Sequence, residues 1–125
     1  MFYIAPNAII DIGNNVGISS SLFYSLDKII IEDNVLIGGG CQILDNDFHS
    51  LMYEDRVIYG DREVKSSPIL VKEGAFIGTS SIILKGVTIG ERSIVAAGSV
   101  VVKSIPDNQI WGGNPAKFIR NIDNG

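Results

Sequence analysis

Residues 71–101 read VKEGAFIGTSSIILKGVTIGERSIVAAGSVV. Isoleucine or valine recurs at every sixth position of this stretch, from Val71 to Val101. An amphipathic helix would repeat its apolar residues about every 3.6 positions, and a half-buried strand would repeat them every two. A sustained period of six is instead typical of the hexapeptide β-helix, in which short strands wind into a solenoid. The stretch therefore predicts an all-β solenoid rather than a conventional globular core.

The period also predicts which residues lie above one another. Three six-residue sides make one triangular coil of about 18 residues, stacked about 4.8 Å above the previous coil. The period of six also links Ile31, Ile37 and Ile43. Ile12 precedes Ile31 by 19 positions instead of 18, which predicts an irregular residue in the range 24–28. The predicted core columns are Ile31 with Val71 and Ile89, Ile37 with Ile77 and Val95, and Ile43 with Ile83 and Val101.

The repeat is interrupted once and ends before the C-terminus. The phase breaks between Ile43 and Val71, which predicts a protruding loop at about 49–67. We expect one domain over 1–125, with a C-terminal cap over about 107–125. Because residues 116–122 follow Pro115 and carry apolar side chains at helical spacing, we expect the cap to contain a short helix.

Several glycines follow the inward aliphatic residues of the repeat. Gly38, Gly78 and Gly90 occupy this place, and we interpret them as corners where the backbone adopts positive φ. The run from Gly38 to Gly40 could suggest a phosphate-binding loop. No Gly-Lys-Ser/Thr sequence follows it, so the corner interpretation is favoured.

Composition narrows the classes of protein. A chain of 125 residues that is 46% hydrophobic can bury one core, and its net charge of −4 argues against nucleic-acid binding. The single Cys41 excludes an internal disulfide framework and fits a small packing position. The first residues lack the pattern of a signal peptide, and no run of about 20 apolar residues occurs. We therefore expect a cytoplasmic protein with no integral membrane segment.

Two edges of the predicted triangle have distinct chemistry. Two places after the inward residues lie Gly39, Thr79 and Ala97 on one edge, and Lys85 and Lys103 on another. An edge of small residues lets an extended ligand approach the backbone. The lysines could bind phosphates, although exposed stacked lysines are equally ordinary on a protein surface.

The only histidine of the chain lies where the loop leaves the solenoid. A histidine titrates near neutral pH, so His49 could take a proton from a hydroxyl and return it to a leaving thiolate. From the residues alone, a surface histidine with no catalytic role is equally consistent. Asp47, two residues earlier, could orient the imidazole or could cap backbone amides in the turn.

Three segments together resemble the left-handed β-helix acyltransferases, and more narrowly the maltose and galactoside O-acetyltransferases and the sugar O-acetyltransferases of bacterial surface-polysaccharide clusters. The resemblance covers nearly the whole chain, and the combination is more specific than hexapeptides alone. The segments are DFHSL at 47–51, IGERSIVAAGSVVVKSIP at 89–106 and GGNPAK at 112–117.

The resemblance implies a homotrimer with an active site between neighbouring subunits, acetyl-CoA as the cosubstrate, no metal, and a sugar or saccharide hydroxyl as the acceptor. His49 matches the catalytic base of the family. The positions that match the cofactor site are Thr79 and Ala97 along the pantetheine, Val102 and Lys103 near the outer part of CoA, and Lys117 and Arg120 near its phosphates or adenine.

Three alternative functions follow from the same repeat. A carbonic anhydrase needs three histidine ligands for its metal, and a chain with one histidine supplies too few. An amino-sugar N-acyltransferase is chemically close and stays open. A non-catalytic trimeric scaffold also stays open, because it would keep the coils without using His49 or a CoA groove.

Overall fold

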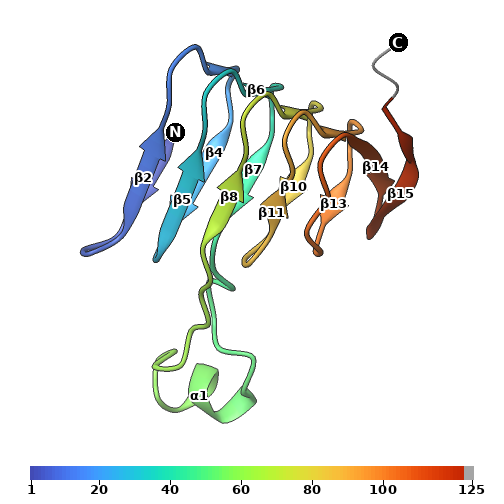
Figure 1. The fold of residues 1–125 in the computed structure, drawn as a ribbon. Helices are drawn as coiled ribbons and strands as arrows, with labels where there is room; N and C mark the ends of the chain where they lie inside the picture. The colour runs from blue at the N-terminus through green and yellow to red at the C-terminus, as the bar shows by residue number, and fades with distance from the viewer. Residues whose placement is uncertain (123–125) are drawn as a thin grey trace.

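The computed structural model describes residues 1–122, which form the predicted left-handed parallel β-helix (Figure 1). Residues 123–125 of the predicted cap lie outside the described part of the chain. In the described part, no helix has the length and apolar character needed to cross a membrane.

Three sheets make the sides of the triangle, and every pairing between successive coils is parallel. The five-stranded sheet contains β1 (Phe2–Ile4), β4 (Leu22–Ser25), β7 (Gln42–Leu44), β10 (Ile82–Ile83) and β13 (Val100–Val101). The four-stranded sheet contains β2 (Ile9–Ile12), β5 (Lys28–Ile31), β8 (Ile69–Val71) and β11 (Thr88–Ile89). The six-stranded sheet contains β3 (Gly17–Ile18), β6 (Leu36–Ile37), β9 (Phe76–Ile77), β12 (Ile94–Val95), β14 (Gln109–Gly113) and β15 (Ala116–Asn121).

The predicted core columns are confirmed. Val71 pairs with Ile31 on one side and Ile89 on the other, and the other two columns pair in the same way. All nine side chains are buried. An irregular corner is confirmed, with two extra residues rather than one: Phe23 of β4 pairs with Ile43, 20 positions later, where a regular coil needs 18.

The interpretation of three glycines was wrong. Gly38, Gly78 and Gly90 do not have positive φ; that conformation belongs to the glycines later in each repeat, at Gly40, Gly74, Gly86 and Gly98. Instead they lie against the backbone of the next coil. A Cβ on Gly78 would come within 2.6 Å of the Ala97 nitrogen, and a Cβ on Gly38 within 2.7 Å of the Thr79 nitrogen. These positions need glycine for close approach between coils.

The predicted C-terminal helix was also wrong, because residues 109–121 form a β-hairpin. The strand β14 pairs in parallel with β12, and β15 folds back antiparallel to β14. The last coil exposes unpaired backbone groups along its edge, and a hairpin satisfies them where a helix could not. Phe118 and Ile119 are about half exposed, whereas Ala116 is buried.

The predicted loop is confirmed, and it protrudes from the solenoid between β7 and β8 (Figure 1). Its neck is a short antiparallel pairing: Asn46 bridges Ser66, and the Ser67 nitrogen donates to the Asp45 carbonyl at 2.9 Å. The tip carries the short helix α1 (Tyr53–Val57).

The close approach between coils gives a stability prediction with a matched control. We expect Gly78→Ala to destabilise the fold by about 1–3 kcal/mol, because the new methyl group overlaps backbone that cannot move independently. Gly39→Ala should change stability by less than about 1 kcal/mol, since a Cβ there meets only the Ser19 Cβ at 3.6 Å. Denaturant unfolding monitored by circular dichroism measures both. Equal effects would contradict this account of the glycines.

Candidate active site

A buried carboxylate holds the point where the loop leaves the solenoid. Asp45 is fully buried and accepts hydrogen bonds from the Ser25 hydroxyl at 2.6 Å and from the backbone nitrogens of Leu26 and Asp27 at 2.8 and 3.0 Å. These donors come from the irregular corner after β4. The extra residues of that corner thus fold around Asp45 and secure the neck of the loop.

The next residue continues this network toward the histidine. The Asn46 amide donates to the Tyr24 carbonyl at 3.3 Å and to Asp45 at 3.1 Å, and its oxygen accepts from the Phe48 nitrogen at 2.8 Å. Phe48 adopts a left-handed conformation, with φ of 64°. The backbone that carries His49 is therefore fixed directly from the body of the solenoid.

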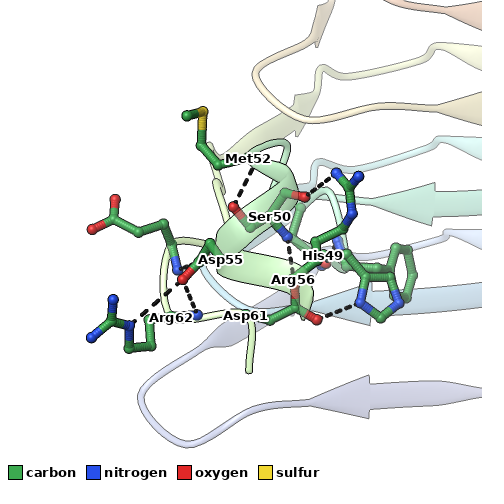
Figure 2. A network of polar contacts seen from close by, with 10 residues as sticks. His49, Ser50, Met52, Asp55, Arg56, Asp61 and Arg62 are labelled. Atoms are coloured by element: carbon green, nitrogen blue, oxygen red, sulfur yellow. Dashed lines mark hydrogen bonds and ion pairs between the residues drawn. The ribbon is translucent and has the colours of Figure 1, made fainter. Parts of the chain in front are cut away.

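His49 is paired with a carboxylate from the far side of the loop. Its Nδ1 lies 2.5 Å from Asp61 Oδ2, and Asp61 Oδ1 accepts from the Ser50 nitrogen at 2.9 Å (Figure 2). A carboxylate partner favours the tautomer in which Nδ1 carries the proton, which leaves Nε2 as a proton acceptor. The His49 side chain is 70% exposed, so the imidazole is open to an incoming molecule.

A second carboxylate holds the loop itself in shape. Asp55 of α1 is buried and accepts from the backbone nitrogens of Arg62 at 3.2 Å and Glu63 at 2.8 Å (Figure 2). Arg56 donates to the Ser50 carbonyl at 2.9 Å. These contacts connect α1 to Ser50, next to His49, and to Arg62 and Glu63, just after Asp61. The helix thus supports the backbone on both sides of the pair of His49 and Asp61.

The carboxyl groups of Asp61 and Asp55 both have pKa values below the usual range. The hydrogen bond with His49 is the main reason why the pKa of Asp61 lies below its usual range, and the Ser50 N–H adds to it. Burial on its own would raise the pKa of Asp55, but hydrogen bonds from Glu63, Ser50 and Arg62 together lower it. Both side chains are therefore ionised at neutral pH.

The carboxylate that contacts the imidazole is Asp61 and not Asp47, which had been considered for this role. Asp47 instead forms an ion pair with Lys85, whose Nζ lies 2.9 Å from Asp47 Oδ1, and its carbonyl accepts from the His49 nitrogen at 2.7 Å. Lys85 is thus occupied by a protein partner. Sequence spacing missed Asp61 because it follows His49 by 12 residues in a loop that has no repeat.

The predicted edge of small residues is present. The Gly39 carbonyl accepts from the Thr79 hydroxyl at 2.6 Å, and the Thr79 carbonyl accepts from the Gly98 nitrogen at 2.8 Å, next to Ala97. Thr79 and Ala97 are both exposed. The two side chains therefore form one accessible strip along the solenoid.

A cleft of about 220 Å³ lies between β13 and the terminal hairpin. It brings together three of the predicted cofactor residues, Val102, Lys103 and Lys117. Arg120 is not among its lining residues; its guanidinium donates to the Asn121 carbonyl at 3.2 Å. The cleft is lined by Val102, Lys103, Trp111, Pro115, Ala116, Lys117 and Phe118.

Trp111 lines this cleft and also closes the end of the core. Its ring packs against the buried cluster, and its Nε1 donates to Gln109 Oε1 at 2.8 Å. The indole that forms the apolar side of the cleft is therefore held in place by the core and by a hydrogen bond. Across residues 1–122, no cluster of three or more histidine, cysteine, aspartate or glutamate side chains is placed to hold a metal ion.

Known protein families match the repeat. Residues 68–103 match the bacterial transferase hexapeptide (six repeats), and residues 28–43 match the hexapeptide repeat of succinyl-transferase. Galactoside O-acetyltransferase of Escherichia coli is 32% identical over 127 residues, which cover 97% of this chain and 61% of that protein. The mitochondrial gamma carbonic anhydrase 2 of Arabidopsis thaliana is 31% identical over 134 residues, which cover 96% of this chain and 48% of that protein. The chain thus spans less than two thirds of either relative.

Solved structures agree with these matches. The hexapeptide-repeat-containing acetyltransferase of Vibrio cholerae is similar with a TM-score of 0.84 and 33% identity over 98% of this chain and 72% of that one. The same enzyme complexed with acetyl-CoA gives a TM-score of 0.84 and 36% identity over 92% and 61% of the two chains. An N-acyltransferase of Bacillus cereus, in complex with dTDP and 3-hydroxybutyryl-CoA, is similar with a TM-score of 0.74 and 26% identity. The match covers 98% of this chain and 80% of that one. With its stacked hexapeptide coils and this likeness along its whole length, the chain belongs to the hexapeptide-repeat acetyltransferases.

Proposed function

We propose that the protein is an acetyl-CoA-dependent O-acetyltransferase that acts on a sugar or saccharide hydroxyl. The observation that carries the proposal is the pair of His49 and Asp61, in which a largely exposed imidazole is held by a carboxylate at the neck of the loop. The similarity to an O-acetyltransferase of galactosides supports the acceptor class. Surface-polysaccharide synthesis is the setting that we propose, in the cytoplasm, where a lone thiol such as Cys41 stays reduced.

In the proposed reaction, His49 acts as a general base and then as a general acid. Nε2 takes the proton from the acceptor hydroxyl while that oxygen attacks the thioester carbonyl carbon. When the carbon–sulfur bond breaks, the proton passes from Nε2 to the leaving thiolate, which gives the acetyl ester and free CoA. Asp61 holds Nδ1–H throughout and stabilises the imidazolium, so it is a positioning residue.

The cosubstrate would follow the small edge and reach the lysine-lined cleft. Thr79 and Ala97 leave room for the pantetheine arm beside the backbone. Lys103 and Lys117 supply two positive charges for the phosphates, and Trp111 offers an apolar wall. Arg120 lies further along β15, outside the lining of the cleft, and we assign it at most an outer contact. The acetyl-CoA complex of the similar Vibrio cholerae enzyme supports this choice of cosubstrate.

The arrangement of the corners supports a homotrimer. His49 follows β7 of the five-stranded sheet, whereas Thr79 follows β9 of the six-stranded sheet, so the two lie at different corners of the triangle. A neighbouring subunit can bring one chain's His49 to another chain's small edge. The loop also exposes a set of apolar side chains that a neighbour would cover. These are Leu51, Met52, Tyr53, Val57, Ile58 and Tyr59, each more than half exposed.

An amino-sugar N-acyltransferase is the second candidate. The same base and the same cosubstrate would serve an amine acceptor, and the similarity to an N-acyltransferase of Bacillus cereus favours keeping it. Paired hydroxyl and amino sugars distinguish the two. An exposed imidazole that is oriented by Asp61 favours catalysis over a purely structural scaffold, since a scaffold has no use for such a pair.

Loss of the base gives the first test of this proposal. We expect acceptor-dependent CoA release from acetyl-CoA to fall by about 10²–10⁴ in His49→Asn, because no other group takes the proton. A thiol-reactive dye measures release across sugars and the matched amino sugars. Glu54→Gln, an exposed change on the same loop, should keep wild-type activity. Undiminished release in His49→Asn would refute the role of the base.

The phosphate contacts give the second test. Lys103→Ala and Lys117→Ala should each raise the KM for acetyl-CoA several-fold, with little change in the KM for the acceptor, because each removes a charge from the phosphate site. The effect should shrink at high salt. Lys28→Ala, at an exposed lysine of β5, is the control. Equal KM values in all three variants would place the phosphates elsewhere.

The lowered pKa of Asp61 predicts how stability responds to acid. A carboxylate with a lowered pKa stabilises the fold above its unfolded value of 3.8, and this contribution is lost as the pH falls through the lower folded value. The melting temperature should therefore drop steeply below about pH 3.8. The drop should be shallower in Asp61→Asn but not absent, since Asp55 behaves in the same way. Asp11→Asn, at an exposed site on β2, should follow the wild type. An unchanged slope in Asp61→Asn would contradict the pairing.

A further inference from the structure

Three aromatic rings stack along the outer face of the five-stranded sheet and end beside His49. Tyr3 of β1 and Tyr24 of β4 are paired neighbours, and their rings lie 4.3 Å apart, nearly parallel at 19°. The Phe48 ring lies 4.6 Å from the Tyr24 ring, tilted by 50°. The three rings thus form a column that begins at Tyr3 in the first coil and ends at Phe48.

Phe48 is an unusual residue for its position. Left-handed backbone is costly for a bulky side chain, and glycine or asparagine would adopt it more easily. Two contacts offset this conformational cost: the Phe48 nitrogen donates to the Asn46 side chain, and the Phe48 ring packs against Tyr24. The side chain is nevertheless 38% exposed, so burial in the core does not account for it. A strained and partly exposed ring next to a candidate base suggests a role in binding.

We propose that Phe48 is the platform on which the pyranose ring of the acceptor packs, with Tyr24 and Tyr3 supporting it from behind. The inference rests on the proposed function and deepens it. Phe48 and His49 are consecutive residues whose α-carbons are about 3.8 Å apart, so a molecule of the size of a pyranose can contact both side chains. A pyranose has an apolar face of C–H groups and hydroxyls around its rim. With that face on Phe48, a rim hydroxyl can reach Nε2 of His49.

The chemistry of the ring favours a neutral ligand at this point. Two cations of this region already have protein partners: Lys85 pairs with Asp47, and Arg56 donates to the Ser50 carbonyl. An aromatic face suits an uncharged sugar ring better than the diphosphate of a nucleotide sugar. In a carrier-linked acceptor, any phosphates would therefore lie away from Phe48.

Two substitutions separate the ring from its backbone conformation. Phe48→Asn removes the ring but keeps a residue that tolerates the left-handed conformation, whereas Phe48→Trp keeps an aromatic face. Phe76→Ala removes a ring that is similarly exposed, on β9 of another sheet, and serves as the control. Size-exclusion chromatography and thermal melts check that each variant keeps the wild-type assembly and fold. The probes are methyl β-D-glucopyranoside, methyl β-D-galactopyranoside and the open-chain sorbitol.

Binding is measured first, by saturation-transfer difference NMR with CoA present, because it does not need turnover. We expect transfer to the C–H protons of at least one pyranoside, little transfer to sorbitol, and about tenfold weaker pyranoside binding in Phe48→Asn. Phe48→Trp and Phe76→Ala should bind within about twofold of wild type. No pyranoside binding to the wild type, or equal binding by wild type and Phe48→Asn, would overturn the inference.

Turnover then separates this inference from the proposed function. If a bound pyranoside is also acetylated, its KM should rise about tenfold in Phe48→Asn while the KM for acetyl-CoA stays constant. Binding that depends on Phe48 without any acetyl transfer would support the platform and count against the acetyltransferase. Acetyl transfer in which the KM for the sugar is the same in wild type and Phe48→Asn would support the acetyltransferase and refute the platform.

Discussion

The stacking of one aliphatic side chain on the next, coil after coil, is the constraint on which the rest of this molecule depends. Each inward residue packs on the residues above and below, as Ile31, Val71 and Ile89 do, and the hydrogen bonds between coils follow the same register. The buried side chains of each coil form this core, so the outward-facing residues between the columns can serve another purpose. The small edge, the lysines and the loop all occupy such positions.

The rigidity of the coils reaches the candidate base through a short chain of contacts. Asp45 closes the irregular corner after β4, Asn46 links that corner to the Phe48 nitrogen, and Asp61 returns from the far side of the loop to hold the imidazole. Each of these hydrogen bonds pairs polar groups, and leaving such groups buried without a partner would cost free energy. A loop outside the repeat thus positions His49 through hydrogen bonds that begin in the solenoid.

The sequence predicted the repeating coils and the places where the repeat is interrupted, but it missed the contacts inside the loop and the terminal hairpin. The core columns and the strip of Thr79 and Ala97 follow from a period of six that holds through 31–43 and again through 71–101, so local contacts and spacing suffice. The partner of His49 was missed because the loop has no period, and a contact across 12 residues depends on how the whole loop folds. The terminal hairpin was missed because pairing with the exposed edge of β12 outweighed the helical spacing of residues 116–122.

A crystal structure with CoA bound tests the central claim most directly, namely that the coils present one chain's His49 to a cosubstrate lying on a neighbouring chain's small edge. The account predicts three subunits about a threefold axis, the CoA thiol within about 3–4 Å of His49 Nε2, and the phosphates beside Lys103 and Lys117. A CoA molecule bound with its thiol far from His49, or a CoA site formed within a single subunit, would contradict it.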